Sequence, residues 1–305
     1  MTVLGVLGVP SSAGARRPGQ GRAPHAFRRA GLLDRLLAAG ITVRDYGDLP
    51  EAVYAPDAGH PRAQNAALVR RVALDVAARI DAMVRDGCAP LVLGGDCTLT
   101  LGVVEGMIRS DAALRLVYFD GDADLKTPQD STSGILDGMV LAHLIGEGLE
   151  ELSRLGSRYP LLATNQVLLF GFDSEARWFG PVDRRRLEQS GMLAYPANYL
   201  RGRAPAIARH VLASFEHPQP RLLVHFDVDV IHFDDFPVAD VPHHGALAFI
   251  EAFETLRVFV ESANFGGLII TEFNIDRDSD GEQVERFVTA LVDMMAATAS
   301  VRRQR

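Results

Sequence analysis

The chain has 305 residues, 31 lysines and arginines against 39 aspartates and glutamates, and a formal net charge of −8. This acidic balance argues against non-specific binding to nucleic acid, which depends on basic side chains, and 48% hydrophobic with 23% charged residues excludes a disordered chain. The only two cysteines, Cys88 and Cys97, argue against a disulfide framework. No uncharged apolar stretch approaches the roughly 18 residues of a membrane span, so we expect a cytoplasmic protein that binds neither membranes nor nucleic acid.

Short apolar runs alternate with stretches of helical period along the chain. In chain order, the predicted strands are Val3–Val9, Ile41–Tyr46, Pro90–Leu93, Arg115–Phe119, Gln166–Phe170, Met192–Tyr195, Arg221–Phe226 and Gly267–Phe273. The helices predicted between them include Pro24–Ala39, Ala63–Arg85, Thr98–Arg109, Arg203–Phe215, Leu247–Glu261 and Glu282–Ala297. Apolar strands separated by helices indicate a parallel sheet covered on both faces. We therefore predict an α/β fold of three αβα layers, with a mainly parallel sheet of about eight strands and a single domain over residues 1–305.

Aspartates are concentrated directly after three predicted strands, in the segments 94–98, 120–124 and 225–229. The carboxyl ends of parallel strands meet at one edge of a sheet, where α/β proteins bind ligands. Carboxylates gathered there repel one another unless cations such as Mn²⁺ or Mg²⁺ neutralise them. A single Asp-x-Asp is usually a turn or a helix cap, but two after buried-type strands favour a metal centre. The aspartates concerned are Asp120, Asp122, Asp124, Asp227 and Asp229, whereas Asp96 is expected to hold a loop through backbone amides.

The same segments resemble the metal-binding motifs of the arginase/agmatinase (ureohydrolase) family. The family motifs read Gly-Gly-Asp-His-Ser, Asp-Ala-His-x-Asp and Ser-x-Asp-x-Asp. The matching segments here read Gly94-Gly95-Asp96-Cys97-Thr98, Asp120-Gly121-Asp122-Ala123-Asp124 and His225-Phe226-Asp227-Val228-Asp229. The likeness covers nearly the whole chain. It implies an arginase-like fold, one or two Mn²⁺ ions per chain, hydrolysis of a guanidino carbon–nitrogen bond, and a homo-oligomer.

Three histidines of the family pattern are replaced in this chain. Cys97 and Asp122 stand where the family has histidine metal ligands, and Asp137 stands where a histidine relays protons. A thiolate at Cys97 favours Fe²⁺, Zn²⁺ or Co²⁺ over Mn²⁺. Two alternatives remain: the metal is iron or a mixed pair, or Cys97 stays protonated and the first site is weak or empty. The retained residues are the implied ligands Asp120, Asp124, Asp227 and Asp229, and Glu272, which in the family holds the substrate guanidinium.

Further candidates follow from their position beside these motifs. His225 and His232 are candidate replacements for the missing histidines, whereas the neighbouring His243 and His244 are expected in a solvated loop. The resemblance also implies the substrate contacts, namely Lys126 and Ser133 for an α-carboxylate, and Asp173 or Glu175 for an α-amino group.

These features together predict a metal-dependent hydrolase that cleaves a carbon–nitrogen bond of a small guanidino or amidino substrate, either arginine or a modified arginine. In this interpretation Glu272 binds the cationic group and Asp137 protonates the leaving amine. Two alternatives stay open. One is a family member that has lost hydrolysis and acts as a binding or regulatory protein. The other is an enzyme that uses Cys97 as a covalent nucleophile on the amidino carbon.

Overall fold

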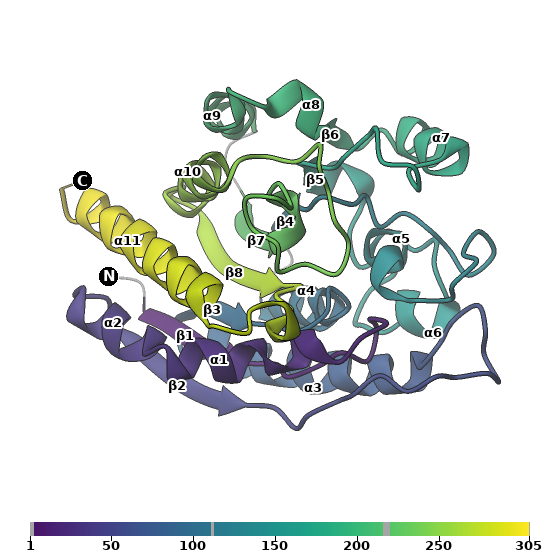
Figure 1. The fold of residues 1–305 in the computed structure, drawn as a ribbon, viewed down its shortest axis with the longest axis horizontal. Helices are drawn as coiled ribbons and strands as arrows, with labels where there is room; N and C mark the ends of the chain where they lie inside the picture. The colour runs from purple at the N-terminus through teal and green to yellow at the C-terminus, as the bar shows by residue number, and fades with distance from the viewer. Residues whose placement is uncertain (1–2, 111–112, 216–219, 305) are drawn as a thin grey trace.

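Eight parallel strands form one sheet in the computed structural model, which describes residues 3–110, 113–215 and 220–304 (Figure 1). The strand order is β2-β1-β3-β8-β7-β4-β5-β6, so the last strand of the chain lies in the middle of the sheet. The predicted parallel α/β sheet is confirmed, and each strand lies within two residues of its predicted bounds. The strands are β1 Val3–Gly8, β2 Val43–Asp48, β3 Cys88–Leu93, β4 Leu114–Phe119, β5 Val167–Phe170, β6 Leu193–Tyr195, β7 Arg221–Asp227 and β8 Phe265–Thr271.

Helices cover both faces of the sheet and complete three layers (Figure 1). One face packs against α1 Ala23–Arg29, α2 Leu32–Ala38, α9 Ala204–Ser214, α10 Phe249–Val260 and α11 Glu282–Gln304. The other face packs against α3 Ala66–Arg85, α4 Leu99–Ser110, α5 Val140–Leu144 and α6 Glu150–Ser153. The remaining helices are α7 Pro181–Ser190, α8 Ala197–Leu200 and the short 3₁₀ helices η1 Gly19–Arg22, η2 Asp137–Met139, η3 Thr164–Gln166, η4 Val228–Val230 and η5 Ile275–Arg277. Among the described residues, no helix combines the length and apolar character needed to cross a membrane.

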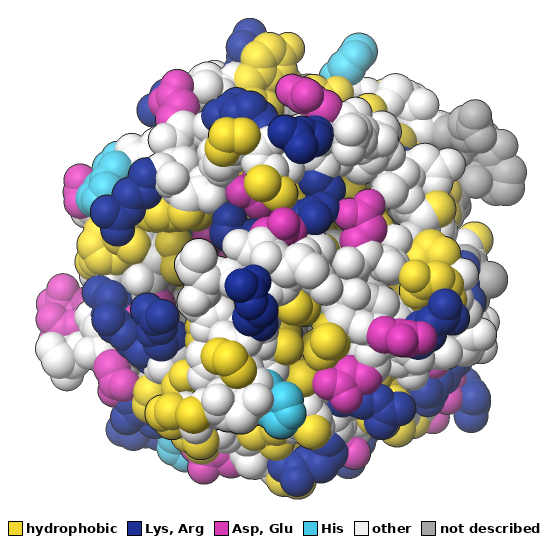
Figure 2. Space-filling model, turned by 90° about the vertical axis from the view of Figure 1, so that its right-hand side faces the viewer, with side chains coloured by type: hydrophobic (Ala, Val, Ile, Leu, Met, Phe, Trp, Pro, Cys, Tyr) yellow, Lys and Arg dark blue, Asp and Glu magenta, His cyan; other side chains and the backbone are white. Residues whose placement is uncertain are grey.

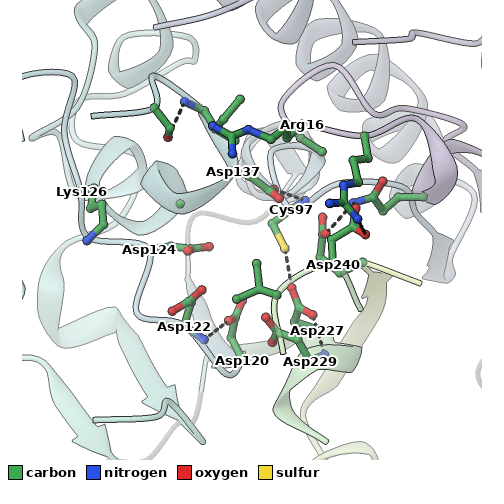
Figure 3. A pocket seen from close by; sticks show the side chains of 18 of the residues that line it. Arg16, Cys97, Asp120, Asp122, Asp124, Lys126, Asp137, Asp227, Asp229 and Asp240 are labelled. Atoms are coloured by element: carbon green, nitrogen blue, oxygen red, sulfur yellow. Dashed lines mark hydrogen bonds and ion pairs between the residues drawn. The ribbon is translucent and has the colours of Figure 1, made fainter. Parts of the chain in front are cut away.

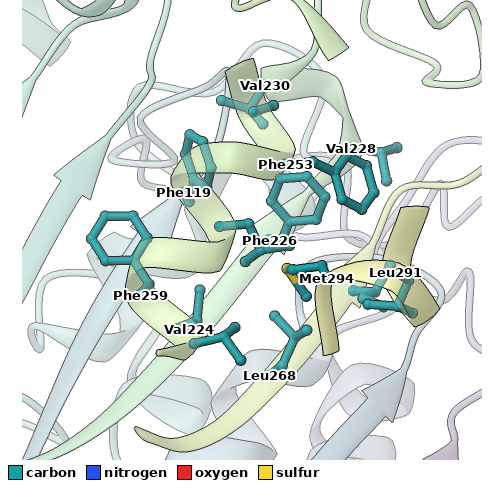
Figure 4. Packing of buried hydrophobic residues seen from close by; sticks show 14 of the residues in the cluster. Phe119, Val224, Phe226, Val228, Val230, Phe253, Phe259, Leu268, Leu291 and Met294 are labelled. Carbon is teal, nitrogen blue, oxygen red and sulfur yellow. The ribbon is translucent and has the colours of Figure 1, made fainter. Parts of the chain in front are cut away.

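The two cores follow from the alternation of side chains along each strand. On β7, Val224 and Phe226 belong to the first core, and Leu223 belongs to the second. Figure 4 shows the first core, in which Phe226 of β7 packs beside Phe253 of α10, and Phe119 of β4 packs beside Phe259 of α10. Because the pattern is apolar on both sides of the strand, β7 is buried on both faces, as the sequence indicates.

One predicted helix is wrong in its extent. The range Pro24–Ala39 is divided into α1 and α2, because Gly31 adopts a left-handed conformation with φ of +74°. Glycine reaches this conformation without a Cβ clash, and the chain changes direction there. The other helices predicted above are found, although their ends are shifted.

The buried histidine His143 in α5 gives the fold a pH dependence. Its side chain is 1% exposed, and its Nδ1 lies 2.6 Å from the Met139 carbonyl oxygen, so Nδ1 carries the proton. The Nε2 atom is buried without a hydrogen-bond partner. Burial lowers the pKa of His143 from 6.5 to about 4. The unfolded chain therefore binds more protons between these two values, and the free energy of unfolding falls as the pH drops from above 6.5 towards 4.

We expect this loss to reach about 3 kcal/mol once the pH is below both pKa values. The variant His143→Asn keeps a side-chain donor near the Met139 carbonyl and removes the titrating ring. The wild-type protein should therefore lose its advantage in melting temperature over the variant as the pH is lowered from neutral. A difference in melting temperature that stays constant with pH would contradict this assignment.

Candidate metal centre

A cavity of about 320 Å³ opens where the loops after β3, β4, β7 and β8 meet. These four strands are consecutive in the sheet, so their carboxyl ends bring the acidic segments together. On the face in Figure 2, acidic and basic side chains gather around a hollow. The lining residues that the sequence pattern singled out are Cys97, Asp120, Asp122, Asp124, Lys126, Ser133, Asp137, Asp227, Asp229 and Glu272 (Figure 3).

The first cluster of candidate metal ligands consists of Cys97, Asp120, His225 and Asp227. Each residue offers a ligand atom, and all these atoms lie within 4.8 Å of one another. The Cys97 Sγ donates to Asp227 Oδ2 at 2.8 Å, and His225 Nε2 lies 3.2 Å from Asp120 Oδ2. His225 and Asp227 reach the same place because they are two residues apart on β7. The cluster therefore combines a sulfur, an imidazole nitrogen and two carboxylates, all buried.

His225 is held in this cluster by residues of two other elements. Its Nδ1 lies 2.8 Å from the Thr100 Oγ1 atom of α4. Its ring stacks on Tyr118 of β4, with the ring centroids 4.1 Å apart. Burial lowers the pKa of His225 to about 3, so the imidazole is neutral. A neutral imidazole with one nitrogen tied to a neighbour is the form in which histidine binds metals.

The second cluster joins Asp122, Asp229 and His243, again with ligand atoms within 4.8 Å of one another. His243 Nε2 lies 3.4 Å from Asp229 Oδ2 and 3.6 Å from Asp122 Oδ2. Both ring nitrogens are buried and lack a hydrogen bond. Burial lowers the pKa of His243, but the charges of Asp122 and Asp229 outweigh it and raise the pKa well above its usual value. A divalent cation bound here would replace the proton of the imidazole and neutralise the two carboxylates that face it.

The carboxylates of this region repel one another. Burial and then the charge of Asp227 raise the pKa of Asp120 well above its usual value, and burial and then Asp122 do the same for Asp124. Asp124 joins neither cluster among the described residues. It accepts a hydrogen bond from the Tyr118 hydroxyl and adopts a φ of +47°.

The donor sets fit divalent transition-metal ions. The sulfur and imidazole of the first cluster suit Fe²⁺, Zn²⁺ or Co²⁺, and the two carboxylates with one imidazole in the second cluster also accommodate Mn²⁺. Cations at these positions would neutralise the mutual repulsion of the acids.

Asp137 and Glu272 lie beside the first cluster in the same cavity, where a carboxylate oxygen of each lies within 4.8 Å of the Cys97 sulfur and of the other. Asp137 Oδ1 accepts a hydrogen bond from the Cys97 backbone amide at 2.7 Å. Burial and then the charge of Asp96 raise the pKa of Asp137 to about 8. Glu272 adopts a φ of +64°. Its Oε2 accepts a hydrogen bond from Gln20 Nε2 at 2.9 Å, and its Oε1 is buried without a partner. Glu272 thus presents a carboxylate oxygen that a cationic ligand would pair.

Of the four residues expected to contact the substrate, two line the cavity and two do not. Lys126 and Ser133 line the cavity. The Lys126 Nζ donates to Asp183 Oδ2 and to the Trp178 carbonyl, both at 3.0 Å, so it already has an anionic partner. Asp173 lies outside the lining and faces His243 Nδ1 at 3.6 Å. Glu175 is exposed and accepts a hydrogen bond from Asn198 at 3.2 Å.

The structure places His243, His225 and His232 in different surroundings, and the sequence pattern predicted these only in part. The expectation of a solvated loop is wrong for His243, whose side chain is 1% exposed. The loop that carries His243 begins shortly after Asp229, and its two ends are joined by the bridge between Ile231 and Leu247. No hydrophobic periodicity in the sequence indicates that bridge. The signal for His225 was present in its two-residue spacing from Asp227 on a strand. His232 lies outside the cavity, beside Asp234 and His244.

The loop role expected for Asp96 is confirmed. Its carboxylate accepts hydrogen bonds from the Gly14 and Thr98 backbone amides at 3.1 and 3.0 Å. It also accepts one from the Ser11 hydroxyl at 3.0 Å. These bonds tie the loop after β1 to the loop after β3 at the edge of the cavity.

Comparisons with known proteins find similarity over most of the chain. The Arginase family model matches residues 3–297. The arginase of Bacillus caldovelox is 26% identical over 265 residues, which cover 86% of this chain and 87% of that protein. Arginase-1 of Sus scrofa is 27% identical over 99% of this chain and 94% of its own length. The solved structure of the Bacillus caldovelox arginase matches with a TM-score of 0.87 and 25% identity, covering 98% of each chain.

Proposed function

Since the chain belongs to the arginase family, as its motifs predicted, we propose that it is a metal-dependent ureohydrolase acting on arginine or a modified arginine. The observation that carries this proposal is the arrangement of one cavity. Two clusters of candidate metal ligands lie there beside Glu272, whose buried Oε1 has no partner. Ureohydrolase-type hydrolysis of a guanidino or amidino group needs both features, because the cationic group must be held next to an activated water.

We assign one ion to each ligand cluster. The first ion would be held by Cys97, Asp120, His225 and Asp227, and the second by Asp122, Asp229 and His243. When bound, such ions lower the pKa of water and so supply a nucleophile near neutral pH. The sulfur donor favours Fe²⁺ or another borderline metal in the first cluster, and Mn²⁺ is the proposed ion of the second.

The other cavity residues bind and orient the substrate. Glu272 pairs with the guanidinium through its free Oε1 atom. Asp137 shares the cavity with Glu272 and gives a proton to the leaving nitrogen. Ser133 and Lys126, together with the exposed Arg16, line the part of the cavity that suits an α-carboxylate. Asp173 and Glu175 take no part in this proposal, because neither lines the cavity.

A modified guanidino group suits this centre better than arginine itself. Carboxylate at position 122 in place of an imidazole makes the centre more anionic and lowers the Lewis acidity that its ions exert. A guanidine that carries an electron-withdrawing substituent, such as a hydroxyl group, on a terminal nitrogen compensates because the substituent makes the guanidino carbon more electrophilic, and the substituent stays on the urea-type product. We therefore propose an N-substituted arginine as the substrate.

The contacts of Cys97 argue against its role as a covalent nucleophile. The thiol donates to Asp227. Burial and then the charges of Asp227 and Asp137 raise the pKa of Cys97 well above its usual value. These surroundings oppose a free thiolate, which is the reactive form.

The proposal is tested by elemental analysis of the purified protein together with assays on arginine and N-hydroxyarginine. We expect at least one transition-metal ion per chain. We also expect the protein to release an amino acid and a urea-type product, and chelation of the metal should abolish this reaction. Hydrolysis by a protein that holds no metal would overturn the proposal. Metal without hydrolysis of any guanidino compound would favour the binding or regulatory alternative.

His243 provides a test of the second cluster. We expect His243→Gln to lose about one ion per chain, since the variant removes one of three ligand side chains, while the first cluster keeps its metal. The matched control is His143→Gln, which replaces another buried histidine outside the cavity. Elemental analysis of the two variants decides between them, and equal metal contents would remove His243 from the ligand set.

A further inference from the structure

Three side chains outside the cavity form a separate cluster of metal-binding type. They are His232, Asp234 and His244, and their ligand atoms lie within 4.8 Å of one another. His244 Nδ1 lies 3.4 Å from Asp234 Oδ1, and the two imidazole centroids are 5.9 Å apart. The side chains of Asp234 and His244 are 71% and 61% exposed, so solvent reaches the cluster. None of the three lines the cavity of the candidate metal centre.

The backbone brings the two segments of this cluster together. The His232 amide donates to the Leu247 carbonyl at 2.7 Å, and the Phe233 amide donates to the His243 carbonyl at 3.0 Å. The His232 Nδ1 accepts a long hydrogen bond of 3.3 Å from the Asp234 amide, and this bond holds the imidazole against the segment that carries Asp234. The spacing of the ligands is therefore set by main-chain pairing and does not depend on three independent surface side chains.

We propose that His232, Asp234 and His244 bind a divalent cation of the Zn²⁺ type at the surface of the protein. Two imidazoles and one carboxylate are the ligand set that zinc takes in three-ligand protein sites, with water in the remaining position. Hard cations such as Mg²⁺ prefer oxygen ligands and would bind this set poorly. The site is distinct from the ligand clusters of the cavity and does not depend on the proposed hydrolytic function.

The outer site shares its two chain segments with the second cluster of the cavity. Asp229 and His232 lie three residues apart on one segment, and His243 and His244 are neighbours on the other. Within each pair, the first residue belongs to the second ligand cluster and the second to the surface cluster. An ion on the outer site therefore joins the segments that carry Asp229 and His243, and it restrains their separation.

The test measures zinc uptake by the protein already loaded with its cavity metals. Wild-type protein and the variants His244→Asn and Asp234→Asn are dialysed against a series of buffered Zn²⁺ concentrations, and zinc is counted per chain. We expect the wild-type protein to bind one more Zn²⁺ per chain than either variant. Even the loss of an outer-shell partner costs about 10–100-fold in metal affinity, so we expect the apparent Kd of this ion to rise at least about tenfold.

The matched control is His60→Asn. His60 is an exposed histidine whose Nδ1 lies 3.0 Å from Asp57 Oδ2, but the pair has no third ligand among the described residues. This variant should bind zinc like the wild-type protein. Equal uptake by all four proteins, or an equal loss in His60→Asn, would overturn the proposal. Melting temperatures measured without zinc confirm that the exposed substitutions leave the fold intact. A second, independent readout is a zinc-induced rise in melting temperature in the wild-type protein and in His60→Asn, but not in His244→Asn or Asp234→Asn.

Discussion

Asp227→Asn is expected to remove the ion of the first cluster and to lower kcat about a thousandfold or more. Asp227 contacts Cys97 through Oδ2 and accepts a hydrogen bond from the Asp229 amide at 2.8 Å through Oδ1, so it lies between the two clusters. Asparagine keeps the second bond and removes the charge. Metal-assisted activation supplies several kcal/mol of transition-state stabilisation, and each 1.4 kcal/mol corresponds to about tenfold in rate.

The metal content and kcat of this variant are measured beside those of Asp278→Asn. Asp278 is a buried aspartate outside the cavity that accepts hydrogen bonds from the Gln283 and Val284 amides at the start of α11. Its asparagine variant keeps one of these two hydrogen bonds and leaves the cavity unchanged, so it should retain metal and activity. Asp227→Asn with normal metal content and normal kcat would exclude Asp227 from the centre.

Glu272→Gln is expected to raise the KM for a cationic amidino substrate at least tenfold while the metal content stays unchanged. Glu272 Oε2 is held by Gln20, and Oε1 has no partner in the protein. Burial and then the charge of Asp137 raise the pKa of Glu272 well above its usual value, because the carboxylate is buried among other acids. A guanidinium would compensate the buried charge of Glu272, so the neutral amide of the glutamine variant should lose the ion pair with the substrate.

The melting temperature separates this role from a structural one. If Glu272 binds substrate, removing a buried charge should leave the metal-free protein equally stable or more stable. If the carboxylate only caps the end of β8, the variant should melt earlier and keep its KM. A destabilised variant with an unchanged KM would therefore remove Glu272 from the substrate site.

The sequence predicts the sheet well because each strand is an apolar run with a clear end. Predicted bounds such as Arg221–Phe226 are close to those observed for β7, since burial on both faces leaves little choice of residue. The break between α1 and α2 was missed because glycine at position 31 is compatible with a helix until its φ is known. Local pattern thus identifies elements, and backbone conformation decides where they turn.

The candidate site is less predictable because its members come from loops. The aspartates at the ends of β4 and β7 were recognised from their position after buried strands. His243 was not, because it reaches Asp122 and Asp229 through a loop whose course depends on the bridge from Ile231 to Leu247. Lys126 is a similar case, since only the fold shows that Asp183 lies within reach of its ammonium group.

The position of β8 determines the order in which the sheet can assemble during synthesis. β8 lies between β3 and β7 and pairs with both, so the two halves of the sheet are joined only through this strand, which is the last of the eight in the chain. During synthesis at about 5–20 residues per second, the nascent chain therefore carries two partial sheets with open edges for many seconds. Asp120, His225 and Asp227 stand on the paired strands β4 and β7 or at their ends, whereas Cys97 follows β3. Cys97 therefore reaches the first ligand cluster only when β8 joins the halves. The cysteine ligand therefore joins the candidate centre as a late step, after the aspartates and His225 on the other half of the sheet are already paired.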